Sequence, residues 1–125
     1  MTHTQAAHLG AWGEQRAVEE LERSGMRVIA RNWRCPLGEI DIVAVDGPDL
    51  VVVEVKTRRS SAKGSALDAV TPAKLARLRR LALQWLAVRP ADCAGQRFRA
   101  IRVDVVAITR PLTGPTVVTH VRGVE

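Results

Sequence analysis

The segment 38–56, GEIDIVAVDGPDLVVVEVK, constrains the fold more than any other part of the chain. It predicts two strands, residues 39–45 and 50–56, joined by a turn with the sequence Asp-Gly-Pro-Asp. The second strand begins with four consecutive apolar residues, 50–53, a pattern typical of a strand that is buried on both faces. We expect the rest of the chain to be arranged around this hairpin.

Four charged side chains interrupt the apolar pattern of the hairpin. Residues two apart on a strand leave the same face, so Glu39 shares a face with Asp41, and Glu54 shares a face with Lys56. An evenly closed turn would place Asp41 opposite Glu54, and Glu39 opposite Lys56. Opposed residues in a sheet have Cβ atoms about 4.5–5.5 Å apart, and like charges at that separation repel each other.

The pair of Asp41 and Glu54 needs compensation. Two carboxylates pressed together on a half-buried strand pair are costly unless a cation or a shared proton offsets the repulsion. A divalent metal ion, Mg²⁺ or Mn²⁺, held by one or two carboxylates and several waters, would offset it. The hairpin therefore predicts a metal site with Lys56 beside it. The alternative is a solvated edge strand, on which Lys and Glu discourage aggregation.

The order of the remaining patterns predicts an α/β fold. A helix is expected at about 4–24 and a strand at 26–33, before the hairpin. After the hairpin, Thr71 and Pro72 open a helix that runs to about 88, and two strands follow within 97–109 and 116–124. The order α-β-β-β-α-β-β indicates a mixed sheet of about five strands flanked by helices. With 125 residues, we expect one domain, 1–125.

Glu14 lies where the first predicted helix should be apolar. At 100° per residue it falls within a stripe formed by Ala7, Ala11, Val18 and Leu21. A carboxylate there requires a partner, and two explanations are open. Glu14 could be held by a buried salt bridge or by a backbone amide, or it could be a third carboxylate directed at the metal site.

The net charge of +6 is concentrated in the segment 57–80. This segment contains seven basic residues and a single acid, so we expect a polyanion to lie across the neighbouring metal site. A solvated helix face is the alternative. The residues expected to contact nucleic acid are Arg58, Arg59, Lys63, Lys74, Arg77 and Arg80.

The composition disfavours binding to unstacked, single-stranded bases. With three tryptophans, one phenylalanine and no tyrosine, the chain has few side chains on which unstacked bases could lie. Contacts to phosphates of duplex or branched DNA are the expected mode of binding.

Several classes of protein are not indicated. Cys35 and Cys93 are isolated, without the spacing of a zinc site or a disulfide framework. The chain has no P-loop and no GxGxxG motif, so no small-molecule cofactor is expected. It also lacks an apolar leader and a segment of membrane-spanning length, and we expect a cytoplasmic protein that does not bind membranes.

Taken together, three segments of the chain resemble the YraN-like family of uncharacterised bacterial proteins. They are GAWGE at 10–14, GEID at 38–41 and VEVKTR at 53–58. This family belongs to the restriction-endonuclease-like PD-(D/E)xK nuclease superfamily, and archaeal Holliday-junction resolvases are more distantly similar. The chain departs from the superfamily pattern at Ile40, where a proline usually precedes the aspartate.

The resemblance implies roles for individual residues. It makes Asp41 and Glu54 the metal ligands, with the backbone carbonyl of Val55 completing the coordination. Glu14 becomes an accessory acid, and Lys56 the catalytic lysine. The activity that we expect of these residues is metal-assisted hydrolysis of phosphodiester bonds in DNA, with branched or damaged duplex as the expected substrate.

Two other functions fit the same residues. The chain could be a nucleic-acid-binding module that retains the fold and the basic surface without turnover. It could also be a protein-interaction domain whose basic surface meets an acidic partner. A homodimer would suit an enzyme that cuts both strands of a duplex.

Overall fold

The structure, a computed structural model, describes residues 2–60, 62 and 64–125. It contains two α-helices and five strands, and their order confirms the predicted α-β-β-β-α-β-β arrangement. The elements are α1 (His3–Arg23), β1 (Arg27–Cys35), β2 (Gly38–Asp46), β3 (Asp49–Arg58), α2 (Pro72–Val88), β4 (Ala100–Thr109) and β5 (Val117–Val121), with short 3-10 helices η1 (Ala66–Ala69) and η2 (Ala91–Cys93).

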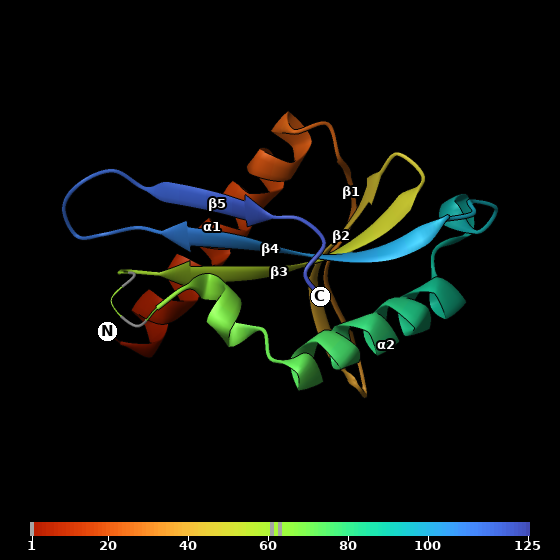
Figure 1. The fold of residues 1–125 in the computed structure, drawn as a ribbon, viewed down its shortest axis with the longest axis horizontal. Helices are drawn as coiled ribbons and strands as arrows, with labels where there is room; N and C mark the ends of the chain where they lie inside the picture. Colours follow the sequence, from red (N-terminus) through yellow and green to blue (C-terminus); the bar gives the residue numbers. More distant parts are fainter. Residues whose placement is uncertain (1, 61, 63) are drawn as a thin grey trace.

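The five strands form one mixed sheet in the order β1-β2-β3-β4-β5 (Figure 1). Only β3 and β4 are parallel, and the chain between them passes through α2. Such a crossover is required because parallel neighbours cannot be joined by a tight turn. The predicted pairing of Val45 with Leu50 across the β2–β3 turn is confirmed.

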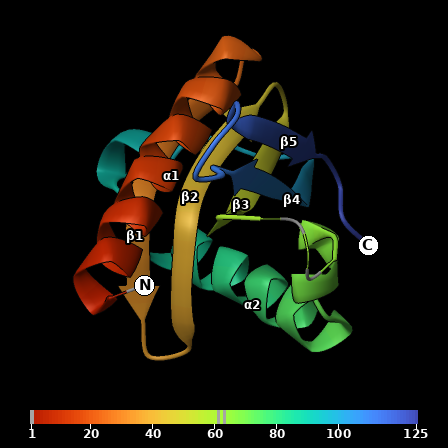
Figure 2. The same cartoon turned by 90° about the vertical axis from the view of Figure 1, so that its left-hand side faces the viewer.

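The two α-helices cover opposite faces of the sheet (Figure 2). One core lies under α1 and contains Val51 and Val53 of β3; the other lies under α2 and contains Leu50 and Val52. The unbroken apolar run of β3 is therefore buried on both faces, as predicted. Within the described part of the chain, no helix is long and apolar enough to cross a membrane.

The buried face of α1 matches the predicted stripe at Val18 and Leu21 but differs from it in the N-terminal half of the helix. Ala7 and Ala11 are exposed, and the helix instead buries Leu9, Gly13 and Ala17 in its first four turns. The reason is the close approach of α1 to β3: a Cβ atom on Gly13 would overlap the side chain of Thr57. The helix rests on the sheet through its smallest residue, and this contact fixes the position of the neighbouring Glu14.

A buried carboxylate holds the end of the chain against β4. Asp104 has no exposed surface and accepts hydrogen bonds from Arg102 (2.9 Å), His120 (2.7 Å) and the amide of Gly123 (3.0 Å). Burial alone would raise the pKa of Asp104, but these hydrogen bonds and the charge of Arg102 outweigh it and lower the pKa. Asp104 is therefore an ionised structural anchor that joins β4, β5 and the C-terminal segment.

We predict that Gly13→Ala destabilises the protein and that Gly10→Ala does not. The added methyl group at position 13 collides with Thr57, and overpacking of this kind costs about 1–3 kcal/mol. Position 10 lies in the same helix with no atom near the added Cβ, so alanine should raise helix stability by up to about 1 kcal/mol. Urea denaturation of both variants measures the difference, and equal stabilities would contradict the proposed close approach.

Candidate active site

A fork in the sheet creates the candidate site. The β2–β3 ladder runs from the turn to the pair Ile42–Val53. Beyond that pair, β2 continues beside β1 and β3 continues beside β4, so the two central strands separate (Figure 1). Asp41 and Glu54 are the first residues past the last pair, one on each side of the fork.

The alternation of side chains along β2 breaks at Asp41. Ile42 packs in the core under α1, whereas Ile40 packs in the core under α2, although residues two apart should share a face. At the same level of β1, Asn32 has a left-handed backbone with φ of 50°. Because of this irregularity, Asp41 extends into the fork between the two strands.

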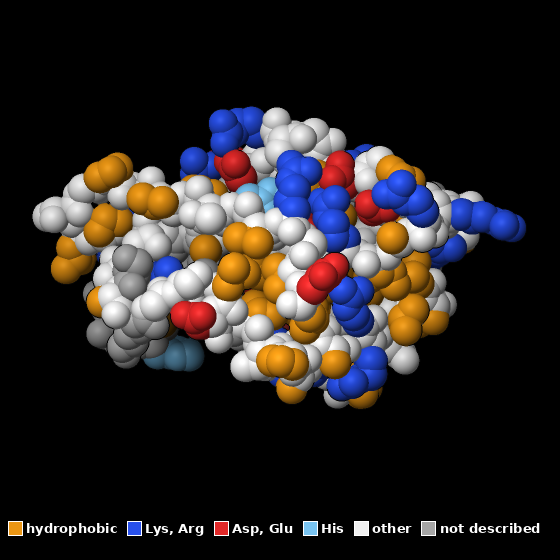
Figure 3. All heavy atoms as spheres, viewed as in Figure 1, with side chains coloured by type: hydrophobic (Ala, Val, Ile, Leu, Met, Phe, Trp, Pro, Cys, Tyr) orange, Lys and Arg blue, Asp and Glu red, His pale blue; other side chains and the backbone are white. Residues whose placement is uncertain are grey.

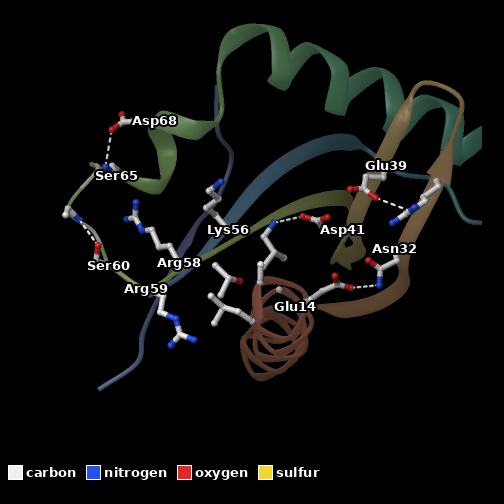
Figure 4. Close-up of a pocket in the computed structure, with 17 residues that line it drawn as sticks. Glu14, Asn32, Glu39, Asp41, Lys56, Arg58, Arg59, Ser60, Ser65 and Asp68 are labelled. Carbon is white, nitrogen blue, oxygen red and sulfur yellow. Dashed lines mark hydrogen bonds and ion pairs between the residues drawn. The ribbon is translucent and has the colours of Figure 1, made fainter. Parts of the chain in front are cut away.

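The carboxylate of Asp41 binds a backbone amide of β3 that a regular ladder would pair with a carbonyl oxygen of β2. Its Oδ2 accepts a hydrogen bond of 2.8 Å from the amide of Val55 (Figure 4). Burial raises the pKa of Asp41 to about 6; the Val55 amide acts in the opposite direction, and the charges of Glu54, Glu14 and Glu39 add to the rise. Ionisation of Asp41 at neutral pH therefore costs more than that of an ordinary aspartate, and a cation nearby would offset this cost.

The predicted pairing of acids across the hairpin was wrong in its details. Neither Asp41–Glu54 nor Glu39–Lys56 forms a ladder pair, because the strands diverge one residue earlier. Asp41 and Glu54 nevertheless border the same small hollow, and Glu54 acts on the pKa of Asp41. Glu39 also borders this hollow, where it forms an ion pair of 3.1 Å with Arg34 in place of Lys56.

Glu54 is paired with a lysine from α2. Lys74 Nζ lies 2.6 Å from Glu54 Oε1, and the Glu54 side chain is only 16% exposed. Thr71 caps the helix and Pro72 begins it, as predicted, so Lys74 stands in the first turn directly over the acid. Lys74, predicted to contact nucleic acid, therefore supplies part of the positive charge that the acidic fork requires.

Glu14 is bound by side chains of β1 and also borders the hollow beside Asp41. Its Oε1 accepts a hydrogen bond of 2.7 Å from Asn32 and lies 3.7 Å from Arg31 Nε. The same side chain borders the hollow beside Asp41 and raises the pKa of that residue. Of the two explanations for Glu14, the held carboxylate is observed, with side-chain partners in place of a backbone amide, and its position beside Asp41 leaves the accessory role open.

Two hollows meet at Asp41. The larger, of about 910 Å³, lies between α1, the fork and the segment after β3, and Lys56 and Arg58 extend into it from β3 (Figure 4). The smaller, of about 210 Å³, lies on the α2 side and is bordered by Glu54 and Lys74. A ligand in either hollow would therefore reach the Asp41 carboxylate.

The predicted basic residues are distributed around these hollows. Arg58 and Arg59 border the larger one, and Arg58 Nη1 is held by the carbonyl oxygen of Gly64 at 2.6 Å. Arg77 borders the smaller hollow. Arg80 is exposed on α2 and borders neither hollow, and Lys63 lies outside the described residues.

The donor set of the fork fits a hard divalent cation. Val55 directs its amide toward Asp41, and the amide and carbonyl of one strand residue point to the same side, so the carbonyl also faces the fork. Two carboxylates and a carbonyl are oxygen ligands of the kind that Mg²⁺ and Mn²⁺ prefer. No group of three or more His, Cys, Asp and Glu side chains among the described residues could hold a metal ion, so the fork would depend on the carbonyl and on water.

Asn32 was not singled out in the sequence, although it orients Glu14 and marks the irregularity beside Asp41. No motif contains it. The available signal was weak: asparagine tolerates the left-handed backbone better than most residues, and here it interrupts a predicted strand region.

The fold and the site define an α/β protein with two acids and a lysine where two central strands separate. The model of Uncharacterised protein family UPF0102 matches residues 13–108, so the chain belongs to this family, and the resemblance to the YraN-like family is confirmed. The chain is similar to a UPF0102 protein of Kineococcus radiotolerans, with 55% identity over 100% of both chains.

Other relatives agree with this assignment. A UPF0102 protein of Beutenbergia cavernae is 53% identical over 93% of this chain and 94% of its own length. A UPF0102 protein of Mycolicibacterium vanbaalenii is 48% identical over 99% of each chain. These names state a family and no activity.

We predict that the free energy of unfolding falls as pH rises from about 4 to 6 through the contribution of Asp41. The folded state holds the Asp41 proton more tightly than the unfolded state, because the pKa is about 6 against an ordinary 3.8. The penalty at pH 8 is up to about 3 kcal/mol, at about 1.36 kcal/mol per pH unit. Asp41→Asn, which keeps an acceptor for the Val55 amide, should remove it.

Urea denaturation at pH 4 and at pH 8, without divalent metal, measures this effect. The Asp41→Asn variant should gain stability relative to the wild type between the two pH values, whereas the exposed control Glu19→Gln should not. Parallel profiles for all three proteins would show that Asp41 is not strained in the folded state.

Proposed function

We propose that this protein is a metal-dependent nuclease that hydrolyses phosphodiester bonds in DNA, with branched or damaged duplex as its substrate. The observation that carries the proposal is the position of Asp41. Its carboxylate lies in the fork with its pKa raised to about 6, beside Glu54 and the main chain of Val55. A half-buried acid with a perturbed pKa that borders two hollows is typical of a functional site.

Each residue of the fork has a separate task in this proposal. Asp41, Glu54 and the Val55 carbonyl would hold Mg²⁺ or Mn²⁺, which supplies a water of lowered pKa and offsets charge on the phosphate. Lys56 extends into the larger hollow, where it would orient the attacking water and stabilise the anionic transition state. Glu14 would hold water next to Asp41 through the carboxylate oxygens that Asn32 leaves available.

The basic residues would hold the DNA backbone across the site. Arg58 supports this role, because it extends into the larger hollow and is held there by the carbonyl oxygen of Gly64, which leaves its charge available to a phosphate. Arg59, Lys63, Arg77 and Arg80 would add further phosphate contacts. Binding should therefore weaken steeply with salt.

One observation favours a second candidate function. The ion pair between Lys74 and Glu54, at 2.6 Å, already supplies a cation to one of the two proposed ligands. A nucleic-acid-binding module without turnover could retain the fork in this form. Metal would then have no effect on its binding to DNA.

We predict that the wild type cleaves DNA in the presence of a divalent metal. The cleavage rate should fall by at least about 100-fold in Asp41→Asn and in Lys56→Ala. The first change removes a ligand charge, and the second removes the cation that stabilises the transition state. Supercoiled and branched DNA with Mg²⁺ or Mn²⁺ are the substrates, and the exposed change Glu19→Gln is the control.

Cleavage that survives both substitutions would point to a contaminating nuclease and reject the site. Tight binding of DNA without product and without a metal effect would favour the binding module. A basic surface that prefers an acidic protein over DNA in competition would favour the interaction domain.

A further inference from the structure

We propose that a groove on the far flank of α2 is a second binding site for the phosphodiester backbone of nucleic acid. The proposal rests on the proposed function, since it assumes a nucleic-acid substrate. The groove has a volume of about 610 Å³ and lies between the C-terminal half of α2 and the segment 96–101 that leads into β4. It is separate from the fork, because no residue borders both.

Four arginines surround this groove, and none of the described residues that line it is acidic. They are Arg79 and Arg89 from α2 and its cap, and Arg97 and Arg99 from the segment before β4. Lys and Arg side chains gather at this end of the molecule, where β4 begins (Figure 3). The positive charge here lies outside the basic segment 57–80, except for Arg79.

Two of the four arginines, Arg79 and Arg89, are oriented by backbone carbonyl oxygens. Arg89 donates hydrogen bonds to the carbonyl oxygens of Gln96 (2.8 Å) and Ala94 (2.9 Å) and lies over the ring of Phe98 at 5.9 Å. Carbonyl partners orient a guanidinium group without cancelling its charge. Among the described residues, only Arg99 of the four pairs with an acid, Asp49, at 3.2 Å.

The chemistry of the groove favours phosphate. All four cations are arginines, whose planar guanidinium groups match the oxygens of a phosphate through two parallel hydrogen bonds. Phe98 and Leu86 add apolar surface that could contact a sugar, and the volume suits a ligand of nucleotide size. Carboxylates could also pair with arginine, so an acidic protein segment is the competing occupant.

The position of the groove suits a strand that also reaches the fork. Arg77 borders the hollow beside the fork, whereas Arg79 borders the groove on the other flank of the same helix. Lys74 and Arg89 lie fifteen residues apart on α2 and its cap, which corresponds to about 22 Å at 1.5 Å per residue. The groove would therefore contact the backbone about six base pairs from the site of cleavage.

The test compares two pairs of substitutions in an Asp41→Asn background, which removes cleavage. Arg79→Gln with Arg97→Gln removes two charges from the groove while leaving Arg89, which holds the loop. Arg23→Gln with Arg122→Gln removes two charges elsewhere and serves as the matched control. Fluorescence anisotropy with a 20-bp duplex between 50 and 200 mM KCl gives the dependence of log K on log salt.

We predict that the groove variant lowers the magnitude of this slope by about 1.8, corresponding to two phosphate contacts, and weakens binding about tenfold at 100 mM KCl. The control should change the slope by less than about half of that amount. Equal slopes for the two variants would overturn the proposal. Loss of binding to polyglutamate, with DNA binding intact, would assign the groove to an acidic protein and overturn it too.

The same measurements test the groove separately from the nuclease activity. A wild type that binds DNA without cleaving it, together with the predicted change of slope, rejects the nuclease and supports the groove. A wild type that cleaves DNA while the slopes coincide supports the nuclease and rejects the groove. A wild type that does not bind DNA rejects both.

Discussion

The structure depends on the hydrogen bond from the Val55 amide to the Asp41 carboxylate, formed where the β2–β3 ladder stops. A regular ladder would have used this amide for a backbone partner and sealed the two strands together. Because a side chain takes it instead, β2 and β3 are not paired at this level, and a half-buried carboxylate is held where they separate. Two hollows then meet at Asp41, and Lys74 of the N-terminal turn of α2 pairs with the neighbouring Glu54.

This arrangement is unfavourable for folding, which is an argument for function. Burial and three neighbouring acids oppose ionisation of Asp41, and among the described residues the Val55 amide is the group that favours it. By contrast, the fully buried Asp104 has its charge satisfied by Arg102, His120 and the Gly123 amide, and its pKa is lowered. The same chain thus supports one carboxylate fully and leaves another short of positive charge. Proteins commonly retain such strain where a ligand is to be bound.

The sequence predicted the parts of the protein that follow local rules. The order of elements, the Val45–Leu50 register and the cap of α2 are each set by neighbouring residues, and all are confirmed. The direction of the Asp41 side chain was not predictable from the sequence of β2. The alternation of side chains along β2 breaks at Asp41, next to the irregular backbone of Asn32 in the partner strand β1. The exposure of Ala7 and Ala11 follows from the contact of Gly13 with Thr57. The spacing of apolar residues along the helix could not reveal this contact, because it involves a residue of another element.

The proposal that Asp41 and Glu54 together bind a divalent cation can be tested with a crystal grown in Mn²⁺. We expect an anomalous peak in the fork about 2.1 Å from one oxygen of each carboxylate, with Lys74 moved away from Glu54. A crystal without such a peak, in which Glu54 remains paired with Lys74 and turned away from Asp41, would contradict it.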